Sequence, residues 1–442
     1  MVLLALAVGL PACTDAIWPT YHHDAARTGN DTAAPALLPI ARAWSTPLDG
    51  ALYAQPVVLD GRVIAATEND TVYALDGHDG HVLWSTHVGT PVTGIVGLAG
   101  CGDIDPLGIT STPVVDVNTN EIFVVAESAT GGVHHQLFAI NAFSGAVTFS
   151  TNVDPTSDAN EVLHLQQRAG LADANGRVYI GFGGLAGDCG TYHGWLVSVQ
   201  ETGGGKISFD VAPHTTQGAI WATSGPAIDN GGSVFVATGN PNPIPATGDY
   251  GESVIKLDPT LHVVDVFTGS NATGDADLGS VGPSLLPGSR LFQTGKQHQG
   301  YVLNSNALAT PIATIPTVCS GDADGGNAYS ATLNYIFVPC RSTPITAVNL
   351  NTNTIQWTNG AANGPPILAG GELWSVKWNG GTLVAMSPST GHTDATMAVG
   401  QSVPNFTSPS AALGLILVPT SSGVTAFAGP SGLPPPAPPP PG

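Results

Sequence analysis

The chain has 442 residues, of which 42% are hydrophobic and only 10% are charged. Its 11 Lys and Arg stand against 32 Asp and Glu, which gives a net charge of −21. Such a surface repels phosphate backbones and anionic lipids, so the composition argues against nucleic-acid binding and against adsorption to anionic membranes. Gly (56) and Pro (36) are abundant, which favours many short strands joined by tight turns.

The N-terminus carries features of an export signal. Residues Val2 to Ala12 form a short apolar stretch that ends at Cys13, as in the h-region of a signal peptide. Leu10-Pro11-Ala12-Cys13 resembles a bacterial lipobox, although no Lys or Arg precedes it. We therefore expect residues 1–16 to be a signal or lipobox region. The protein would be extracellular, periplasmic or at the cell surface, either free or anchored through a lipid on Cys13.

From residue 41 onward, one unit recurs along the chain. It opens with a strand preceded by Pro or a small residue, continues through a Gly-rich hairpin and ends in a strand with an aromatic residue. The openings at positions 56, 113, 169, 226 and 283 are evenly spaced, and three more follow near 330, 365 and 408. Short β-branched and aromatic runs bounded by Gly, Asn or Asp predict strands. Eight openings with four strands each predict an eight-bladed, all-β propeller with antiparallel blades.

The last blade lacks a fourth strand in the sequence that follows its opening. Ala43-Trp44-Ser45-Thr46 copies Leu83-Trp84-Ser85-Thr86, so the N-terminal copy is expected to complete that blade and close the ring. The aromatic residues that end the units are interpreted as wedges between blades; they are Trp44, Trp84, Phe149, Phe209 and Trp357. The domain is predicted to span residues 17–429, and the Pro-rich residues 430–442 to form a disordered tail or linker.

The unit Ala-x-Asp-x-x-x-Gly-x-x-x-Trp resembles the repeat of the pyrroloquinoline-quinone (PQQ)-like propellers, and the likeness spans about residues 18–429. Trp18–Gly29 is similar to the start of exported members. Gly108–Asp116, Tyr192–Trp195 and Gly225–Asp229 resemble an uncharacterised exported bacterial branch. The superfamily includes quinoprotein dehydrogenases and outer-membrane assembly scaffolds.

The resemblance also implies what a dehydrogenase would need. In those enzymes a pair of adjacent cysteines covers the quinone, and a Ca²⁺ held by carboxylate and amide oxygens polarises it. This chain has no adjacent cysteines and no Cys-x-x-Cys-His haem motif. These departures disfavour PQQ as a cofactor and leave Ca²⁺ open. Catalytic residues stay unassigned.

Apart from Cys13 the chain has four cysteines, an even number that favours two disulfides in an exported protein. In an up-and-down blade, the loop entering the first strand and the loop between the second and third strands share one face. All four cysteines are expected in such loops, and the predicted bonds are Cys101–Cys189 and Cys319–Cys340. Free buried thiols are the alternative.

The same face, the mouth of the channel, is expected to hold the ligand. Three Asp pairs precede innermost strands and could bind Ca²⁺, or they could be solvated loop residues; they are Asp103 with Asp105, Asp275 with Asp277, and Asp322 with Asp324. Arg168 could hold a carboxylate or phosphate, or it could be satisfied by loop carbonyls or an Asp of the next blade. The other candidate ligand contacts are Gln55, Gln167, His193, Trp195, Trp221 and Tyr329, with packing as the alternative for His193.

Three functions are compatible with these residues. The first is an exported, monomeric scaffold that binds a ligand or protein partner at the channel mouth without catalysis. The second is a PQQ- and Ca²⁺-dependent oxidoreductase. The third is a surface protein that binds or processes glycans. The sequence favours the first, because no complete catalytic set can be placed on it.

Overall fold

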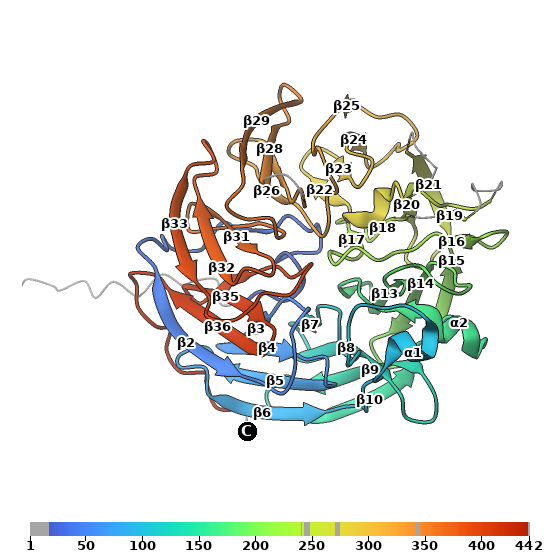
Figure 1. Ribbon diagram of the computed structural model, residues 1–442, viewed down its shortest axis with the longest axis horizontal. Coiled ribbons are helices and arrows are strands. Elements are labelled where there is room, and N and C mark those ends of the chain that lie inside the picture. Colours follow the sequence, from blue (N-terminus) through green and yellow to red (C-terminus); the bar gives the residue numbers. More distant parts are fainter. Residues whose placement is uncertain (1–16, 240, 243–247, 270–274, 342–344, 441–442) are drawn as a thin grey trace, which may run out of the picture.

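The computed structural model describes residues 17–239, 241–242, 248–269, 275–341 and 345–440. Within these ranges, eight four-stranded antiparallel blades surround a central channel (Figure 1). The predicted eight-bladed propeller is therefore confirmed. The helices described are short loop segments, namely α1 (Ile95–Ala99), α2 (Ala159–His164) and the 3₁₀ turn η1 (Leu278–Ser280). Among the described residues, none of these helices has the length and apolarity needed to cross a membrane.

Each of the first seven blades takes its strands in chain order from the channel outward. Blades one to four consist of β3 (Val57–Leu59), β4 (Arg62–Ala66), β5 (Thr71–Asp76) and β6 (Val82–His87); β7 (Val114–Asp116), β8 (Glu121–Ser128), β9 (His134–Asn141) and β10 (Val147–Asn152); β12 (Ala172–Ala174), β13 (Arg177–Gly184), β14 (Trp195–Gln200) and β15 (Ile207–Asp210); and β17 (Ala227–Ile228), β18 (Val234–Ala237), β20 (Ser253–Leu257) and β21 (Val263–Thr268).

The remaining blades follow the same plan, except that the outer strand of blade eight precedes blade one in the chain. They consist of β22 (Ser284–Leu286), β23 (Arg290–Thr294), β24 (Gly300–Asn304) and β25 (Ala313–Ile315); β26 (Ala328–Ser330), β27 (Tyr335–Val338), β28 (Ile345–Asn349) and β29 (Thr354–Asn359); β30 (Ile367–Ala369), β31 (Glu372–Lys377), β32 (Thr382–Met386) and β33 (Thr393–Ala398); and β34 (Ser410–Ala412), β35 (Leu415–Thr420), β36 (Gly423–Ala428) and β2 (Ala41–Pro47).

Four short strands lie outside this plan. They are β1 (Asn30–Asp31), which joins blade seven in parallel with β30, β11 (Leu165–Gln166), which pairs with β13, and the pair β16 (Thr216–Gln217) and β19 (Pro241–Asn242).

Blade eight closes the ring as the sequence predicts. Strand β2 pairs antiparallel with β36, and Trp44 stands opposite Ala426. Figure 1 shows this N-terminal strand, in blue, beside the red strands of the C-terminal blade. Because the first and last parts of the chain share one sheet, backbone hydrogen bonds close the ring, and β2 covers the edge of β36 that would otherwise be exposed.

The repeat has a physical reason that links neighbouring blades. Trp44 packs against the turn of blade one, where a Cβ on Gly80 would lie 2.5 Å from its ring. The Trp44 indole nitrogen also donates to the Gly77 carbonyl at 3.1 Å. Gly80 has a φ of 77°, so it is needed both for the turn and for the close approach of the ring. Trp84 packs in the same way on Gly145 of blade two.

The N-terminal residues before β2 close the channel from within. We call residues 17–31 the channel plug. Backbone hydrogen bonds join it to the inner strands of blades one, two, four, five, six and seven, through Val58, Val115, Ile228, Leu285, Tyr329 and Leu368. The plug therefore makes the inner strands of non-adjacent blades part of one connected structure.

Two buried polar side chains hold the plug in place. The Arg27 guanidinium donates to the carbonyls of Leu171, Pro226 and Tyr21 and to the Thr20 hydroxyl. His22 stacks on Tyr21, and its ring nitrogens contact the Asn327 carbonyl and the Ser408 hydroxyl. Burial lowers the pKa of His22 to about 3, so this histidine is neutral at pH 7.

Candidate functional site at the channel mouth

A cavity of about 550 Å³ opens at the mouth, on the face formed by the loops that enter the inner strands. Its wall includes the backbone of residues 184–188, in the loop after β13. Its charged lining combines three cations with four carboxyl groups, and its rings belong to Trp221 and Phe406; the charged residues are Arg168, Lys296, Arg341, Asp103, Asp188, Asp275 and Asp277. The mouth thus concentrates three of the chain's 11 basic residues.

Each predicted Asp pair supplies a partner for one of these cations. Lys296 Nζ lies 2.5 Å from Asp275 Oδ1 and 2.8 Å from Asp277 Oδ2. Arg168 pairs with Asp103 at 3.3 Å, and Arg341 Nε lies 3.7 Å from the buried Asp324.

Asp105 and Asp322 lie apart from the cavity lining. Asp105 accepts a hydrogen bond from the Gly94 backbone nitrogen, and Asp322 contributes its carbonyl to the Arg341 nitrogen. At least one member of each predicted Asp pair therefore forms an ion pair with a cation of the mouth. Among the described residues, the one group of three side chains with ligand atoms within 4.8 Å of one another is Asp76, Asp79 and His81, outside this site.

The aromatic rings of Trp221 and Phe406 lie against the three cations. The Phe406 ring lies 4.7 Å from the Arg168 guanidinium carbon and 5.4 Å from that of Arg341. Lys296 Nζ stands 5.3 Å from the Trp221 ring, and Trp221 meets Phe406 edge to face at 6.0 Å. Cation–π contacts of this kind strengthen when water is excluded, so the cavity offers flat surfaces flanked by positive charge.

Burial changes the protonation of the carboxyl groups behind the cations. It raises the pKa of Asp277 to about 6 despite the adjacent Lys296. It likewise raises the pKa of Asp324 to about 6, although Arg341 opposes the shift. For Lys296, burial alone would lower the pKa, but the Asp277 and Asp275 carboxylates hold it above its ordinary value. At neutral pH the lysine is charged and Asp277 is mostly ionised, with its midpoint for gaining a proton at about pH 6.

Both predicted disulfides are present, and one of them borders the cavity. Cys101–Cys189 joins the loop entering blade two to the loop after β13, and Cys319–Cys340 closes a 21-residue separation at blade six. A Cβ on Gly187 would lie 3.3 Å from Cys101 Cβ, and the Gly102 nitrogen donates to the Ala186 carbonyl. The first disulfide therefore braces the wall formed by residues 184–188.

Several predicted contacts lie away from the cavity. Gln55 is buried against the plug, where it accepts from Trp18 and His22 and donates to Ser408. Gln167 donates to the carbonyls of Ala169 and Gly181. Tyr329 in β26 bonds to Asn334 in the turn at the end of its strand. These three polar groups have hydrogen-bond partners within the fold and are not part of the cavity lining.

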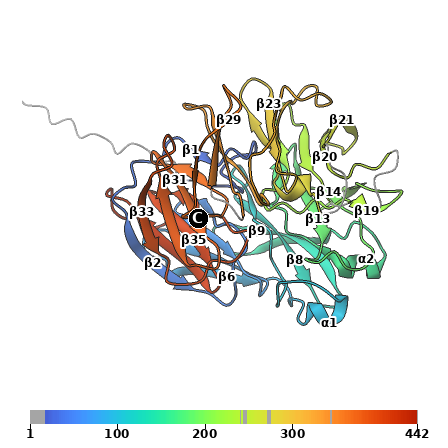
Figure 2. The same cartoon turned by 45° about the horizontal axis from the view of Figure 1, so that its top comes forward.

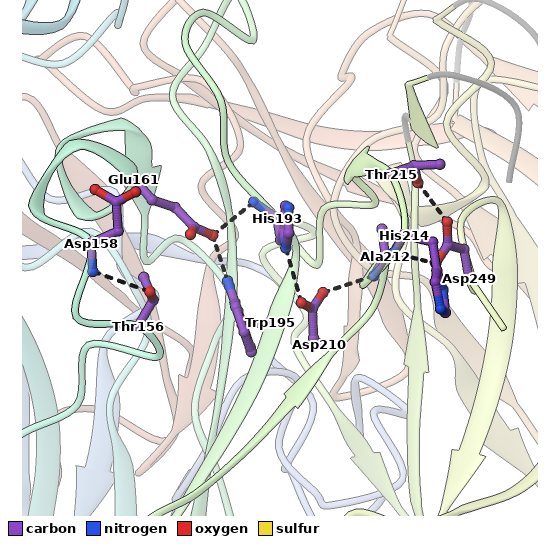
Figure 3. A network of polar contacts seen from close by, with 10 residues as sticks. All are labelled: Thr156, Asp158, Glu161, His193, Trp195, Asp210, Ala212, His214, Thr215 and Asp249. Carbon is purple, nitrogen blue, oxygen red and sulfur yellow. Dashed lines mark hydrogen bonds and ion pairs between the residues drawn. The ribbon is translucent and has the colours of Figure 1, made fainter. Parts of the chain in front are cut away.

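His193 and Trp195 belong to a separate network (Figure 3). The Glu161 carboxylate accepts from the Trp195 indole nitrogen at 2.9 Å and from the His193 backbone nitrogen at 3.0 Å. The His193 ring pairs with Asp210 at 2.9 Å. This hydrogen bond raises the pKa of His193, although burial opposes it. The arrangement ties α2 to blade three.

Sequence reasoning missed three residues that complete the cavity. Lys296 follows β23, Arg341 follows β27, and Phe406 lies in the loop before β34. Lys296 and Arg341 occupy the same link, between the second and third strands, that contains Cys189 in blade three. The scarcity of basic residues was the available signal for them. No sequence pattern points to Phe406, because its position depends on the conformation of the surrounding loop, in which its backbone φ is 66°.

Comparisons with known proteins agree with the fold. A family model described as outer membrane protein assembly factor BamB matches residues 41–183. No curated protein matches the sequence. A quinohaemoprotein alcohol dehydrogenase from Pseudomonas putida superposes with a TM-score of 0.75 at 14% identity, covering 96% of this chain and 82% of that one.

Two further solved structures represent the two kinds of relative. A europium-containing methanol dehydrogenase has a TM-score of 0.74 at 14% identity, with 93% of this chain and 98% of that chain covered. BamB from Moraxella catarrhalis has a TM-score of 0.62 at 13% identity, with 88% and 99% covered. At these identities the likeness concerns the fold alone, and the two dehydrogenases and BamB share it.

Proposed function

We propose that this PQQ-like β-propeller binds a small, flat, anionic organic molecule in the cavity at its channel mouth. The observation that carries the proposal is the convergence of Arg168, Lys296 and Arg341 on the rings of Trp221 and Phe406. A planar ligand would stack on the rings, and its carboxylates or phenolate oxygens would meet the cations. The volume of about 550 Å³ suits a ligand of drug-like size.

The aspartates do not cancel this preference. The side chains of Asp103 and Asp275 are 44% and 72% exposed, so water screens their pairing, and such pairs contribute about 0–1 kcal/mol. A ligand carboxylate could take their place at little cost. Asp277 and Asp324, with pKa values of about 6, gain protons readily when a second anion enters. The cavity therefore becomes more positive as an anionic ligand binds.

A PQQ-type quinone is a specific candidate within this class, since solved structures with this fold include a quinohaemoprotein alcohol dehydrogenase. The residues present fit such a group. Arg168, Lys296 and Arg341 would hold its carboxylates and Trp221 its flat face, and Asp188 would supply an oxygen suited to a hard cation. A bound quinone supplies a two-electron acceptor. Asp277 is the carboxyl group positioned to take a proton beside it, and this favours an oxidoreductase as the second candidate function.

Binding is tested by titrating the purified protein with PQQ, with and without Ca²⁺, and following tryptophan fluorescence and quinone absorbance. We expect saturable binding that weakens at least tenfold in Arg168→Gln and Trp221→Leu. Arg42→Gln is the control, because Arg42 lies on the outer strand β2 and bonds to the Ala398 carbonyl. Equal affinities in all variants would place binding outside the cavity. A dye-reduction assay on alcohols and sugars then separates a binding protein from an oxidoreductase.

The proposal includes export to an oxidising compartment. It is supported by the two disulfides, which persist outside the cytoplasm. The predicted lipidation site, Cys13, and the proposed signal at residues 1–16 lie outside the described residues. Fractionation of cells that express the protein, with mass spectrometry of its mature N-terminus, tests both. An uncleaved cytoplasmic product would contradict this part of the proposal.

A further inference from the structure

Three carboxyl side chains are buried where blades one and two meet, and we call them the seam carboxylates. They are Glu68 and Asp70, in the loop between β4 and β5, and Glu127 near the end of β8. Their exposed fractions are 1%, 0% and 2%. Buried carboxylates are found in proteins when a partner compensates them, so the partners of these three decide their role.

Gly108 in the loop entering blade two connects the three residues. Its backbone nitrogen donates to Glu68 Oε2 at 2.8 Å, and its carbonyl accepts from the Glu127 nitrogen at 3.2 Å. A Cβ on Gly108 would lie 2.7 Å from Asp70 Oδ1 and against the Glu68 carbonyl. The carboxylates of Glu68 and Asp70 thus meet the same glycine from blade one, while the backbone nitrogen of Glu127 reaches it from blade two.

Most of the oxygens of the seam carboxylates lack a hydrogen-bond donor among the described residues. Glu68 Oε1 and both oxygens of Asp70 and Glu127 are buried without such a partner. Glu127 has a cation nearby, because its Oε2 lies 3.4 Å from His135 Nε2. Among the residues that the structure describes, Asp70 has no ion pair within 4.0 Å, and a Cβ added to Gly89 or Gly108 would lie 2.7 Å from one of its oxygens. A side chain larger than glycine at either position would clash with the Asp70 carboxylate.

The surrounding charges do not compensate the seam carboxylates. His135 is shared between Glu127 and Asp154, and Asp49 accepts from the hydroxyls of Thr67 and Thr71. Arg168 and Tyr53 act on Glu68 only at longer range. Burial raises the pKa values of Glu68 and Asp70 to about 8, which is the response of carboxyl groups that lack a cation.

We propose that the seam carboxylates bind one divalent cation, with Ca²⁺ as the ion suited to an all-oxygen site. A hard cation accepts several oxygens at once and neutralises two carboxylates together, which protons would do only one at a time. The ligand atoms of the seam carboxylates are more widely spaced than those of Asp76, Asp79 and His81, so a shared ion would require the seam side chains to move closer together. The ion would connect blades one and two, and it does not depend on the ligand proposed for the mouth.

The test uses the whole exported chain, freed of metal with EDTA, and a Ca²⁺ titration followed by calorimetry and thermal unfolding. We expect one tightly bound equivalent and a rise of several degrees in unfolding temperature. Asp70→Asn should abolish both effects and, in EDTA, unfold at a higher temperature than the wild type, because the unpartnered carboxyl is gone. Asp79→Asn is the matched control at the exposed group, and it should retain the full response.

Two results would overturn the proposal. One is the absence of Ca²⁺-dependent stabilisation in the wild type, which would mean that protonation alone neutralises the seam carboxylates. The other is an equal Ca²⁺ response in wild type and Asp70→Asn. If Asp70→Asn fails to fold, Glu68→Gln replaces it with the same expectations. Elemental analysis of the wild type purified without chelator gives an independent readout, and less than 0.1 equivalent of Ca²⁺ after saturation and desalting would contradict tight binding.

Discussion

Arg27 and Arg168 illustrate how the same side chain serves structure in one place and recognition in another. Arg27 is fully buried, and each of its acceptors belongs to the plug or to an inner strand entrance. Arg168 instead shares an exposed aspartate and the face of Phe406 at the cavity. The acceptors explain the two roles. Buried backbone carbonyls fix Arg27 in place, whereas a ligand can replace the exposed carboxylate that pairs with Arg168.

Replacement of Arg27 is predicted to destabilise the whole ring. Arg27→Met removes four hydrogen bonds and leaves buried carbonyls without donors, which should cost about 3 kcal/mol or more of unfolding free energy. Urea denaturation followed by tryptophan fluorescence measures the change. Arg42→Met, on the outer strand, should cost less than about 0.5 kcal/mol. Equal losses in the two variants would show that the plug does not hold the blades together.

Buried acids and His135 predict how stability depends on pH in the metal-free protein. The pKa values of Glu68 and Asp70 are raised to about 8 by burial. Burial alone would lower the pKa of His135, but Asp154 and Glu127 raise it to about 9. In the native state Glu68, Asp70 and His135 therefore hold protons that the same groups have released in the unfolded chain. The stability that these bound protons provide is lost as the pH rises.

The clearest window lies between pH 6.5 and 9, above the range in which His22 titrates on unfolding. In EDTA, the unfolding temperature should fall steadily across this window. Asp70→Asn should flatten part of the slope, since one of the protons is no longer exchanged. Differential scanning calorimetry at constant ionic strength measures the unfolding temperature at each pH. A wild-type curve that rises with pH would reverse the sign and contradict the assignment.

At the scale of the elements, the turn between β5 and β6 explains why the sequence repeat exists. Asp76 Oδ1 accepts from the His78 nitrogen at 2.8 Å, which fixes the start of the turn. Gly80 then closes the turn and receives the Trp44 ring of the preceding blade. The Asp, Gly and Trp positions of the unit therefore record contacts between blades rather than chemistry.

Two glycine replacements separate turn strain from blade packing. Gly80→Ala adds a Cβ 2.5 Å from the Trp44 ring, whereas Gly176→Ala adds one with no atom within 4 Å, and the two φ values are 77° and 72°. Strain alone should cost about 1 kcal/mol at each position. Overpacking should add about 1–3 kcal/mol at Gly80 only. Thermal and chemical denaturation of both variants tests this, and equal losses would argue against the wedge role of Trp44.

Much of the fold and part of the site could be predicted from these repeats. Once the copies were aligned, Cys101 and Cys189 fell on one face, and Arg168, Trp221 and Asp277 fell beside them. The plug could not be predicted, because its contacts are backbone hydrogen bonds from Trp18–Gly29 to inner strands spread along the chain from Val58 to Leu368. The pairing of Lys296 and Arg341 with aspartates depends on how neighbouring blades meet, which no periodicity encodes.

At the scale of the whole molecule, two features support the mouth from opposite sides. The plug fills the channel below it, and Cys101–Cys189 braces the wall beside it. The C-terminal residues also pack on the ring, where the Ala437 nitrogen donates to Asp76 and the Pro434 carbonyl contacts His78. The cavity is therefore bounded by loops from several blades that a disulfide braces, which favours a preformed binding site.

The two disulfides should differ in what their removal changes. In the chain-entropy model, loss of the 88-residue link Cys101–Cys189 costs about 4–5 kcal/mol and loss of the 21-residue link Cys319–Cys340 about 3 kcal/mol. The double Cys→Ser variant at 101 and 189 should also weaken ligand binding at the mouth, because the wall at 184–188 loosens. The variant at 319 and 340 should lose stability alone. Calorimetry and the PQQ titration distinguish these outcomes.

The most direct test of the central claim is a crystal structure of the protein grown with PQQ and Ca²⁺. The account predicts flat density over the Trp221 ring, with carboxylates directed at Arg168, Lys296 and Arg341, and displacement of at least one of Asp103 and Asp275 from its present pairing. Ligand density on another face of the propeller, or a cavity that retains its ion pairs at saturating ligand concentration, would contradict it.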